Sequence, residues 1–193
     1  MIDSPTDPLR VAAQVTGALG QLGVRYSIGG SMASSLSGEP RSSLDIDIVA
    51  ALQESDVEAF VEALEHAFYV DRAALERAIR AHSTANLIHL ATSVKVDLFI
   101  AGGTVIDADL LQRRVPVFVG ENPAICIYVH TAEDILLQKL RWYRMGGETS
   151  DRQWRDIMGI IRVQGNRLDR EYIERQAERL GVKDLWTTAT MGA

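Results

Sequence analysis

The sequence predicts an α/β protein, with strands and helices up to about residue 130 and a helical part after it. Before residue 130, short apolar and β-branched runs alternate with stretches of helical periodicity. After His130 only helical periodicity remains. The chain has 193 residues, of which 47% are hydrophobic and 24% are charged, so it is long and apolar enough for one packed domain with a helical appendage.

The first elements are a helix, a short strand and a glycine turn. Apolar residues recur at three- and four-residue steps over 8–22, which predicts an amphipathic helix that ends at Gly23. Residues 24–28 are typical of a buried strand. Gly29-Gly30-Ser31 then breaks the strand, and the small residues at 32–36 favour the start of a helix.

Residues 45–50 alternate acidic and branched apolar side chains, which predicts a second strand. The same kinds of signal predict the elements that follow. In chain order these are helices at 55–68 and 71–81, two hairpin strands at 86–92 and 94–100, and weaker strands at 115–119 and 125–129.

The helical part begins with a capping signal. Thr131 and Asp134 have the spacing of a capping box, and helical periodicity follows to about Met145. A glycine-rich loop at 146–150 separates this helix from two further helices, which are predicted at 151–163 and 169–180.

Composition and charge exclude several classes of function. The net charge of -6 argues against wholesale nucleic-acid binding, which relies on an excess of Lys and Arg. No apolar run approaches the roughly 18 residues that cross a bilayer, and residues 1–8 contain no basic residue, so neither a membrane anchor nor a signal peptide is expected. Cys126 is the only cysteine, which excludes an intrachain disulfide and fits a reducing, cytoplasmic setting.

Two carboxylates share one face of the strand predicted at 45–50. Because side chains alternate along a strand, Asp45 and Asp47 project from the same face, ~7 Å apart. Such a pair suits a hard divalent cation, since magnesium takes one or two carboxylates together with substrate phosphates. Alone, the pattern is more typical of the solvated face of a half-exposed strand.

Two further features accompany this pair. Gly29-Gly30-Ser31 lies between a strand and a helix, where backbone N–H groups and the helix dipole bind phosphate. In the strand at 94–100, Lys95, Asp97 and Phe99 share one face, so Asp97 offers the third carboxylate of a two-metal phosphoryl-transfer site. The alternative for this strand is an ordinary exposed face with a surface Lys and Asp.

Gly30-Ser31, Asp45-Ile46-Asp47-Ile48 and Val96-Asp97-Leu98 together resemble the signature of the DNA polymerase beta-like nucleotidyltransferase superfamily, over about residues 24–100. Within it, the chain is most similar to small bacterial nucleotidyltransferases of the abortive-infection and toxin-antitoxin type. The resemblance implies a nucleotidyltransferase-like mixed β-sheet flanked by helices. Residues 1–130 would form the catalytic domain, and residues 131–193 would form a helical region packed on it.

The resemblance also implies a reaction and its residues. Asp45 and Asp47 would bind two Mg²⁺ or Mn²⁺ ions, and Asp97 would bind the ion that activates the acceptor. Gly29, Gly30 and Ser31 would hold the phosphates of a nucleoside triphosphate. The residues just before the metal-binding strand would either contact phosphate or form a surface loop; they are Arg41, Ser42 and Ser43.

Lys139 lies within the apolar arc of the helix predicted after Thr131. An unpaired buried ammonium is costly, so Lys139 must snorkel, pair with a carboxylate or bind phosphate. Asp156, at the edge of the apolar stripe of the next helix, could face it. The segments around both residues resemble the family pattern that places a lysine and an aspartate near the nucleotide, so both are candidate catalytic residues.

Two functions are expected from the sequence. The first is transfer of a nucleoside monophosphate to an acceptor hydroxyl of a protein side chain, a transfer RNA end or a small molecule, as an enzyme that could belong to a toxin-antitoxin system. The second is a nucleotide-binding or antitoxin-like module that binds a partner protein without turnover. Three clustered carboxylates favour the enzyme, because an interaction module has no physical need for them.

Overall fold

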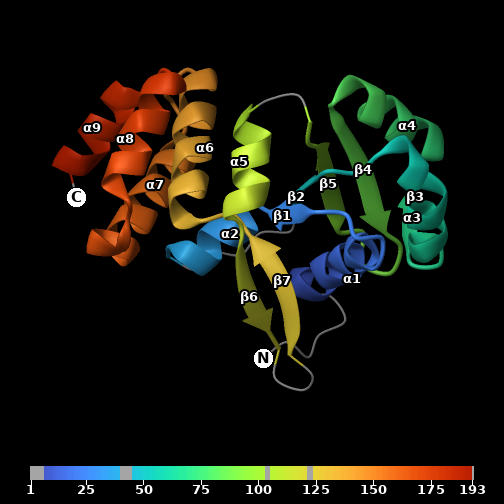
Figure 1. Ribbon diagram of the computed structural model, residues 1–193. Coiled ribbons are helices and arrows are strands. Elements are labelled where there is room, and N and C mark those ends of the chain that lie inside the picture. The colour runs from blue at the N-terminus through green and yellow to red at the C-terminus, as the bar shows by residue number, and fades with distance from the viewer. Residues whose placement is uncertain (1–6, 40–44, 103–104, 121–123, 193) are drawn as a thin grey trace. The chain divides into compact units, whose positions relative to one another are not determined.

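The structure is a computed structural model that describes residues 7–39, 45–102, 105–120 and 124–192. The chain divides into two compact units, whose elements are labelled in Figure 1. The sheet unit comprises Met1–Met32 and Ser43–His130, and the helical unit comprises Ala33–Ser42 and Thr131–Ala193. The catalytic role expected for residues 1–130 and the packing expected for residues 131–193 stay predictions.

In the described part of the chain the sheet unit contains a seven-stranded sheet with the order β3-β4-β5-β2-β1-β7-β6. β2 pairs with β5 and β1 with β7 in parallel, and the other neighbours are antiparallel. The predicted fold class with a mixed sheet is therefore confirmed. The strands are β1 (Tyr26–Ile28), β2 (Ile46–Ala50), β3 (Phe68–Val70), β4 (Thr84–His89), β5 (Lys95–Ile100), β6 (Val115–Val119) and β7 (Ile125–Val129).

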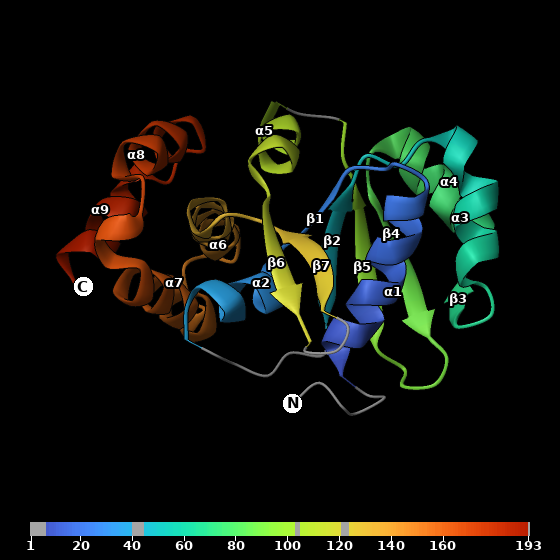
Figure 2. The ribbon, with the colours of Figure 1, turned by 60° about the horizontal axis from the view of Figure 1, so that its bottom comes forward.

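Several helices of the sheet unit pack against the strands. α1, α3 and α4 pack in sequence on one another, with α1 against β2 and β7 and α4 against β4 (Figure 2). α5 packs against β1 and β2. The helices that begin in the sheet unit are α1 (Pro8–Gln21), α2 (Gly30–Ser37), α3 (Val57–Leu64), α4 (Arg72–Ala81) and α5 (Val105–Arg113), with a short 3-10 turn, η1 (Glu54–Asp56), before α3.

The alternation of β2 and β5 decides which side chains enter the core. Ile46 and Ile48 on β2, and Val96 and Leu98 on β5, are fully buried. The residues between them therefore project from the opposite face of the sheet. Because each strand supplies a row of apolar residues to the core, its polar residues are held on the other face in a fixed register.

Some elements differ from the prediction. The helix predicted at 55–68 ends at Leu64, and Phe68 instead begins the edge strand β3. Phe68 is 2% exposed, and its ring packs against His89 of β4. Its apolar side chain therefore belongs to the core of the sheet and does not extend the apolar stripe of the helix. The hairpin predicted from residue 86 starts two residues earlier, at Thr84. α5 was not predicted, because its sequence mixes Asp and Leu without a clear apolar stripe.

Among the described residues, the helical unit contains four complete helices together with the end of α2. α6 packs against α7 and α8, and α9 packs against α7 and α8. None of the helices in the described ranges is long and apolar enough to cross a membrane. The four helices are α6 (Ala132–Met145), α7 (Asp151–Gln164), α8 (Arg170–Arg179) and α9 (Lys183–Met191), and a short 3-10 turn, η2 (Gly165–Arg167), follows α7.

A buried carboxylate secures the start of α6. The Thr131 hydroxyl accepts a hydrogen bond from the backbone N–H of Asp134 at 3.2 Å, as the capping signal predicts. It also donates to the Asp134 carboxylate at 2.8 Å, and the Tyr172 hydroxyl of α8 donates to the other oxygen at 2.7 Å. Asp134 is 2% exposed, and these bonds stabilise a carboxylate that would otherwise be costly to bury.

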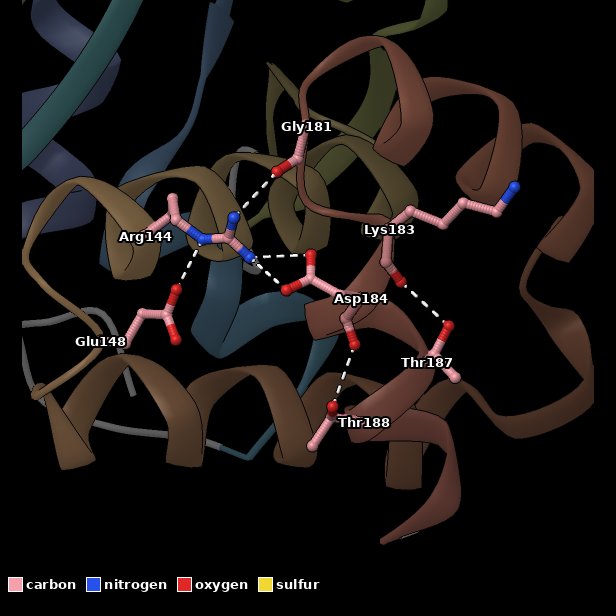
Figure 3. A network of polar contacts seen from close by, with 7 residues as sticks. All are labelled: Arg144, Glu148, Gly181, Lys183, Asp184, Thr187 and Thr188. Atoms are coloured by element: carbon pink, nitrogen blue, oxygen red, sulfur yellow. Dashed lines mark hydrogen bonds and ion pairs between the residues drawn. The ribbon is translucent and has the colours of Figure 1, made fainter.

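An ion-pair network joins α6 to α9, a helix beyond the last one predicted (Figure 3). Arg144 donates to both carboxylate oxygens of Asp184 at 2.7 and 2.6 Å and to the Gly181 carbonyl at 3.2 Å. It also pairs with Glu148 at 2.6 Å. The hydrogen bond from Arg144 lowers the pKa of Asp184. Because these side chains are exposed, the network orients α9 more than it stabilises the fold.

The sheet unit contains a buried Ser–His pair. Ser27 of β1 is fully buried, and its Oγ lies 2.7 Å from Nδ1 of His130, which is 1% exposed. The backbone N–H of His130 also donates to the Ile28 carbonyl at 2.9 Å, which extends the contact between β1 and β7. Desolvation by burial lowers the pKa of His130 from 6.5 to about 4. The side chain is therefore neutral at physiological pH.

We expect His130 to make the fold sensitive to mild acid. Above pH 6.5 it is neutral in both states; as the pH falls from 6.5 to about 4, only the unfolded chain takes up the proton. This linkage lowers the free energy of unfolding by roughly 3 kcal/mol across that interval. In urea unfolding, His130→Asn should have a lower free energy of unfolding than wild type at pH 7.5. Between pH 7.5 and pH 4.5, its free energy of unfolding should fall less than that of wild type. The exposed His66→Asn control should keep the wild-type decline, and an equally steep decline in His130→Asn would contradict the assignment.

Candidate functional site

Asp47 and Asp97 lie side by side on the sheet face opposite the buried residues of β2 and β5. They are register partners in the parallel pairing of these strands. Neighbouring strands are about 4.8 Å apart and register partners point to the same side, so the two carboxylates leave the sheet together. Asp45 directly precedes β2, two residues before Asp47, and is exposed. The parallel pairing thus joins carboxylates from two segments of the sequence.

The glycine turn lies directly against Asp47. The backbone N–H of Gly29 donates to the Asp47 carbonyl at 2.9 Å. Gly30, the first residue of α2, has φ of 58°, and a Cβ on it would lie 1.8 Å from Oδ2 of Asp47. Only glycine fits both the backbone conformation and the space. Ser31 follows in the first turn of α2, where the helix dipole favours an anion.

Lys95 is a cationic neighbour of these carboxylates. Its Nζ lies 2.8 Å from Oδ2 of Asp97, which is two residues further along the same strand face. The hydrogen bond to Asp97 raises the pKa of Lys95, with smaller electrostatic contributions from Asp97, Asp45 and Asp47. All three carboxylates thus act on one ammonium group, which is charged at neutral pH.

Two polar neighbours of Asp97 are missing from the site predicted from sequence. One is Lys95, which the sequence also allowed as a surface residue. The other is Asn86 of β4, which is exposed and is the register partner of Asp97. The register of the β4–β5 hairpin places Asn86 beside Asp97. The sequence did not give this register, because the hairpin turn was predicted further along the chain than it lies.

The donor set at this position suits a hard divalent cation. It consists of carboxylate oxygens from Asp45, Asp47 and Asp97, which are ligands that Mg²⁺ and Mn²⁺ prefer. Gly30 leaves the space beside Asp47 that a side chain would otherwise fill. As the side chains lie, no three His, Cys, Asp or Glu residues in the described ranges form a group that could hold a metal ion. Metal binding would therefore require the side chains to rearrange.

The other predicted site residues lie elsewhere. Arg41, Ser42 and Ser43 fall outside the described residues. Lys139 and Asp156 belong to the helical unit, and Nζ of Lys139 donates to Oδ2 of Asp156 at 2.7 Å. Their side chains are 7% and 12% exposed. The pairing expected across the two helices is confirmed, and a role for the pair at the nucleotide stays a prediction.

Comparison with known proteins bears on the fold. No protein-family model matches the sequence, and no curated protein matches it at a significant level. A similar solved structure is the antigenic nucleotidyltransferase-like protein from Paracoccidioides brasiliensis, with a TM-score of 0.54 and 20% identity, covering 82% of this chain and 77% of that chain.

The antibiotic-resistance factor ANT(2'')-Ia is also similar, in two structures. Its solution structure has a TM-score of 0.54 and 14% identity, covering 96% of this chain and 95% of that chain. Its crystal structure in complex with adenylyl-2''-tobramycin has a TM-score of 0.55 and 11% identity, covering 89% of this chain and 95% of that chain. The chain has a nucleotidyltransferase-like fold. In this chain, β2 and β5 carry Asp47 and Asp97, and Asp45 directly precedes β2.

We expect Gly30→Ala to be more damaging than a glycine substitution of similar backbone conformation. Gly23 has φ of 68° with nothing within 4 Å of an added Cβ, so Gly23→Ala measures the backbone cost alone, about 1 kcal/mol. Gly30→Ala adds the clash with Asp47 and should lower the free energy of unfolding by about 2–4 kcal/mol. Asp47→Ala should reduce the excess. Equal losses for the two glycines in urea unfolding would show that Asp47 does not approach Gly30.

A second prediction concerns the buried pair in the helical unit. Asp156→Asn leaves the Lys139 ammonium without its charged partner and should cost about 3 kcal/mol of unfolding free energy. Lys139→Met combined with Asp156→Leu removes both charges and should recover most of that loss. Chemical denaturation of the three variants tests this. A double variant as unstable as Asp156→Asn would mean that the charges themselves are not the cause.

Proposed function

We propose that this protein is a metal-dependent nucleotidyltransferase that transfers a nucleoside monophosphate from a nucleoside triphosphate to an acceptor hydroxyl. The observation that carries the proposal is the register of Asp47 and Asp97 on adjacent parallel strands, with Gly30 against Asp47. Two carboxylates beside a glycine turn at a helix start combine ligands for divalent cations with donors for phosphate. The nucleotidyltransferase-like fold of similar structures supports the same reaction class.

Each residue then has a role. The backbone of Gly29 and Gly30 and the Ser31 hydroxyl would hold the β- and γ-phosphates. Asp45, Asp47 and Asp97 would hold two Mg²⁺ or Mn²⁺ ions, which when bound neutralise the phosphates and activate the acceptor oxygen. That oxygen would attack the α-phosphorus in line and lose its proton to solvent water, while the bond from the α-phosphorus to the bridging oxygen breaks and pyrophosphate leaves. Lys139, oriented by Asp156, would add a positive charge for the phosphates.

The acceptor that best fits is a small hydroxylated molecule. A similar structure contains adenylyl-2''-tobramycin, in which a nucleotidyl group is joined to such a molecule. The net charge of -6 disfavours a transfer RNA end. A protein side chain, as in a toxin-antitoxin system, is the other acceptor to test.

A nucleotide-binding or antitoxin-like module without turnover is the alternative function. The pairing of Lys95 with Asp97 favours it, because a permanent internal cation would leave no use for a metal ion. Turnover separates the two functions directly. Each of the four triphosphates is supplied with Mg²⁺ or Mn²⁺ and a panel of hydroxylated small molecules, and pyrophosphate release is measured. Metal-dependent release supports the enzyme; partner binding without release supports the module.

Asp45→Asn combined with Asp47→Asn should abolish metal-dependent triphosphate binding and lower turnover at least about a thousandfold, because metal ions supply several kcal/mol of transition-state stabilisation. Stability without metal should hold or rise, since repulsion among carboxylates is relieved. Glu62→Gln combined with Glu65→Gln, both exposed, removes the same charge elsewhere in the sheet unit and should retain activity. Triphosphate affinity equal to wild type in the aspartate variant would reject this site.

A further inference from the structure

Lys95 is placed where it must take part in any cation binding by Asp97. Its ammonium already contacts Oδ2 of Asp97 at 2.8 Å, and both residues lie on the strand face that carries Asp47. The Lys95 side chain is 47% exposed, whereas the Asp97 side chain is 17% exposed. The carboxylate is thus the fixed partner of the pair, and the ammonium, at the end of a flexible stem, is the partner that can leave.

On β4, one of the two strands beside β5, Lys95 has no charged partner on this face. The β4 residues on this face, set by the register with β5, are Thr84, Asn86 and Ile88, and none is charged. Ile88, the register partner of Lys95, is 41% exposed and gives the lysine stem an apolar surface to lie along. Without metal, the carboxylate cluster is therefore the anionic group that holds this ammonium.

We propose that Lys95 competes with the divalent cation for Asp97, and so favours a cation that arrives with a triphosphate over a free cation. This inference rests on the proposed function. A metal ion on either oxygen of Asp97 would lie close to the ammonium that contacts Oδ2, and because the two cations repel each other, binding of the ion weakens the Lys95–Asp97 contact. The Lys95 ammonium can leave Asp97 because the pair is partly exposed, so water hydrates the ammonium when the contact breaks.

The preference for the triphosphate-bound cation follows from charge. A free divalent cation on Asp97 would lie beside the displaced ammonium, and the two positive charges repel. A cation carrying a triphosphate brings compensating negative charge, so the ammonium stays near an anion after it leaves Asp97. Lys95 thus lowers the affinity of the site for the metal ion alone more than its affinity for the metal–triphosphate complex.

The test measures binding of Mn²⁺ alone by electron paramagnetic resonance of the unbound ion, and binding of Mn²⁺ with a nonhydrolysable ATP analogue by calorimetry. Lys95→Met and Lys95→Gln should bind Mn²⁺ alone about fivefold more tightly than wild type, as expected for loss of one competing exposed ion pair. Their affinity for the metal–nucleotide complex should change less than about twofold or weaken. Without metal, their melting temperature should fall.

Three comparisons make the test specific. Lys183→Met removes a lysine paired with Glu178 in the helical unit and should bind Mn²⁺ as wild type does. In an Asp97→Asn background, Lys95→Met should change Mn²⁺ affinity less than it does in wild type. Equal Mn²⁺ affinity in wild type, Lys95→Met and Lys95→Gln overturns the inference and leaves the proposed function standing. No Mn²⁺ binding by any variant, with or without nucleotide, overturns both.

Discussion

The parallel pairing of β2 with β5 is the constraint on which the candidate site depends. It places Ile48 beside Leu98 in the core and, one residue earlier on each strand, Asp47 beside Asp97 on the opposite face. A slip of one residue in either strand would turn that strand's carboxylate into the core and its apolar residues out of it. The apolar contacts that stabilise the sheet therefore also fix the separation of the two acidic residues along β2 and β5. No further interaction is needed to hold the two backbones in place.

The sequence predicts much of this arrangement because period-two alternation is strong in both strands. Asp45, Asp47 and Asp97 could be chosen as a set from their strands and from the glycine turn alone. Their adjacency could not be derived in the same way, since it depends on which strands pair and in which register. The approach of Gly30 to Asp47 and the contact of Lys95 with Asp97 are consequences of that register, so both appear only in the structure.

Elements with weak or divided signals were the ones misjudged. Phe68 continues the apolar spacing of α3, yet it lies in strand β3, where its side chain is buried against β4. α9 is a short helix without a side-chain N-cap, held to α6 by Arg144. Lys139, by contrast, was predictable, because an ammonium within an apolar arc requires a partner, and Asp156 on the next helix supplies it.

The long connection between β2 and β5 affects how the site forms during folding. The chain between β2 and β5 contains η1, α3, β3, α4 and β4. Contacts between residues so far apart in sequence are slow to form, because the entropy of closing a long loop opposes them. A chain with β5 undocked lacks the adjacent carboxylates, so a cation–nucleotide ligand binds only after this step and shifts the equilibrium towards molecules that have completed it.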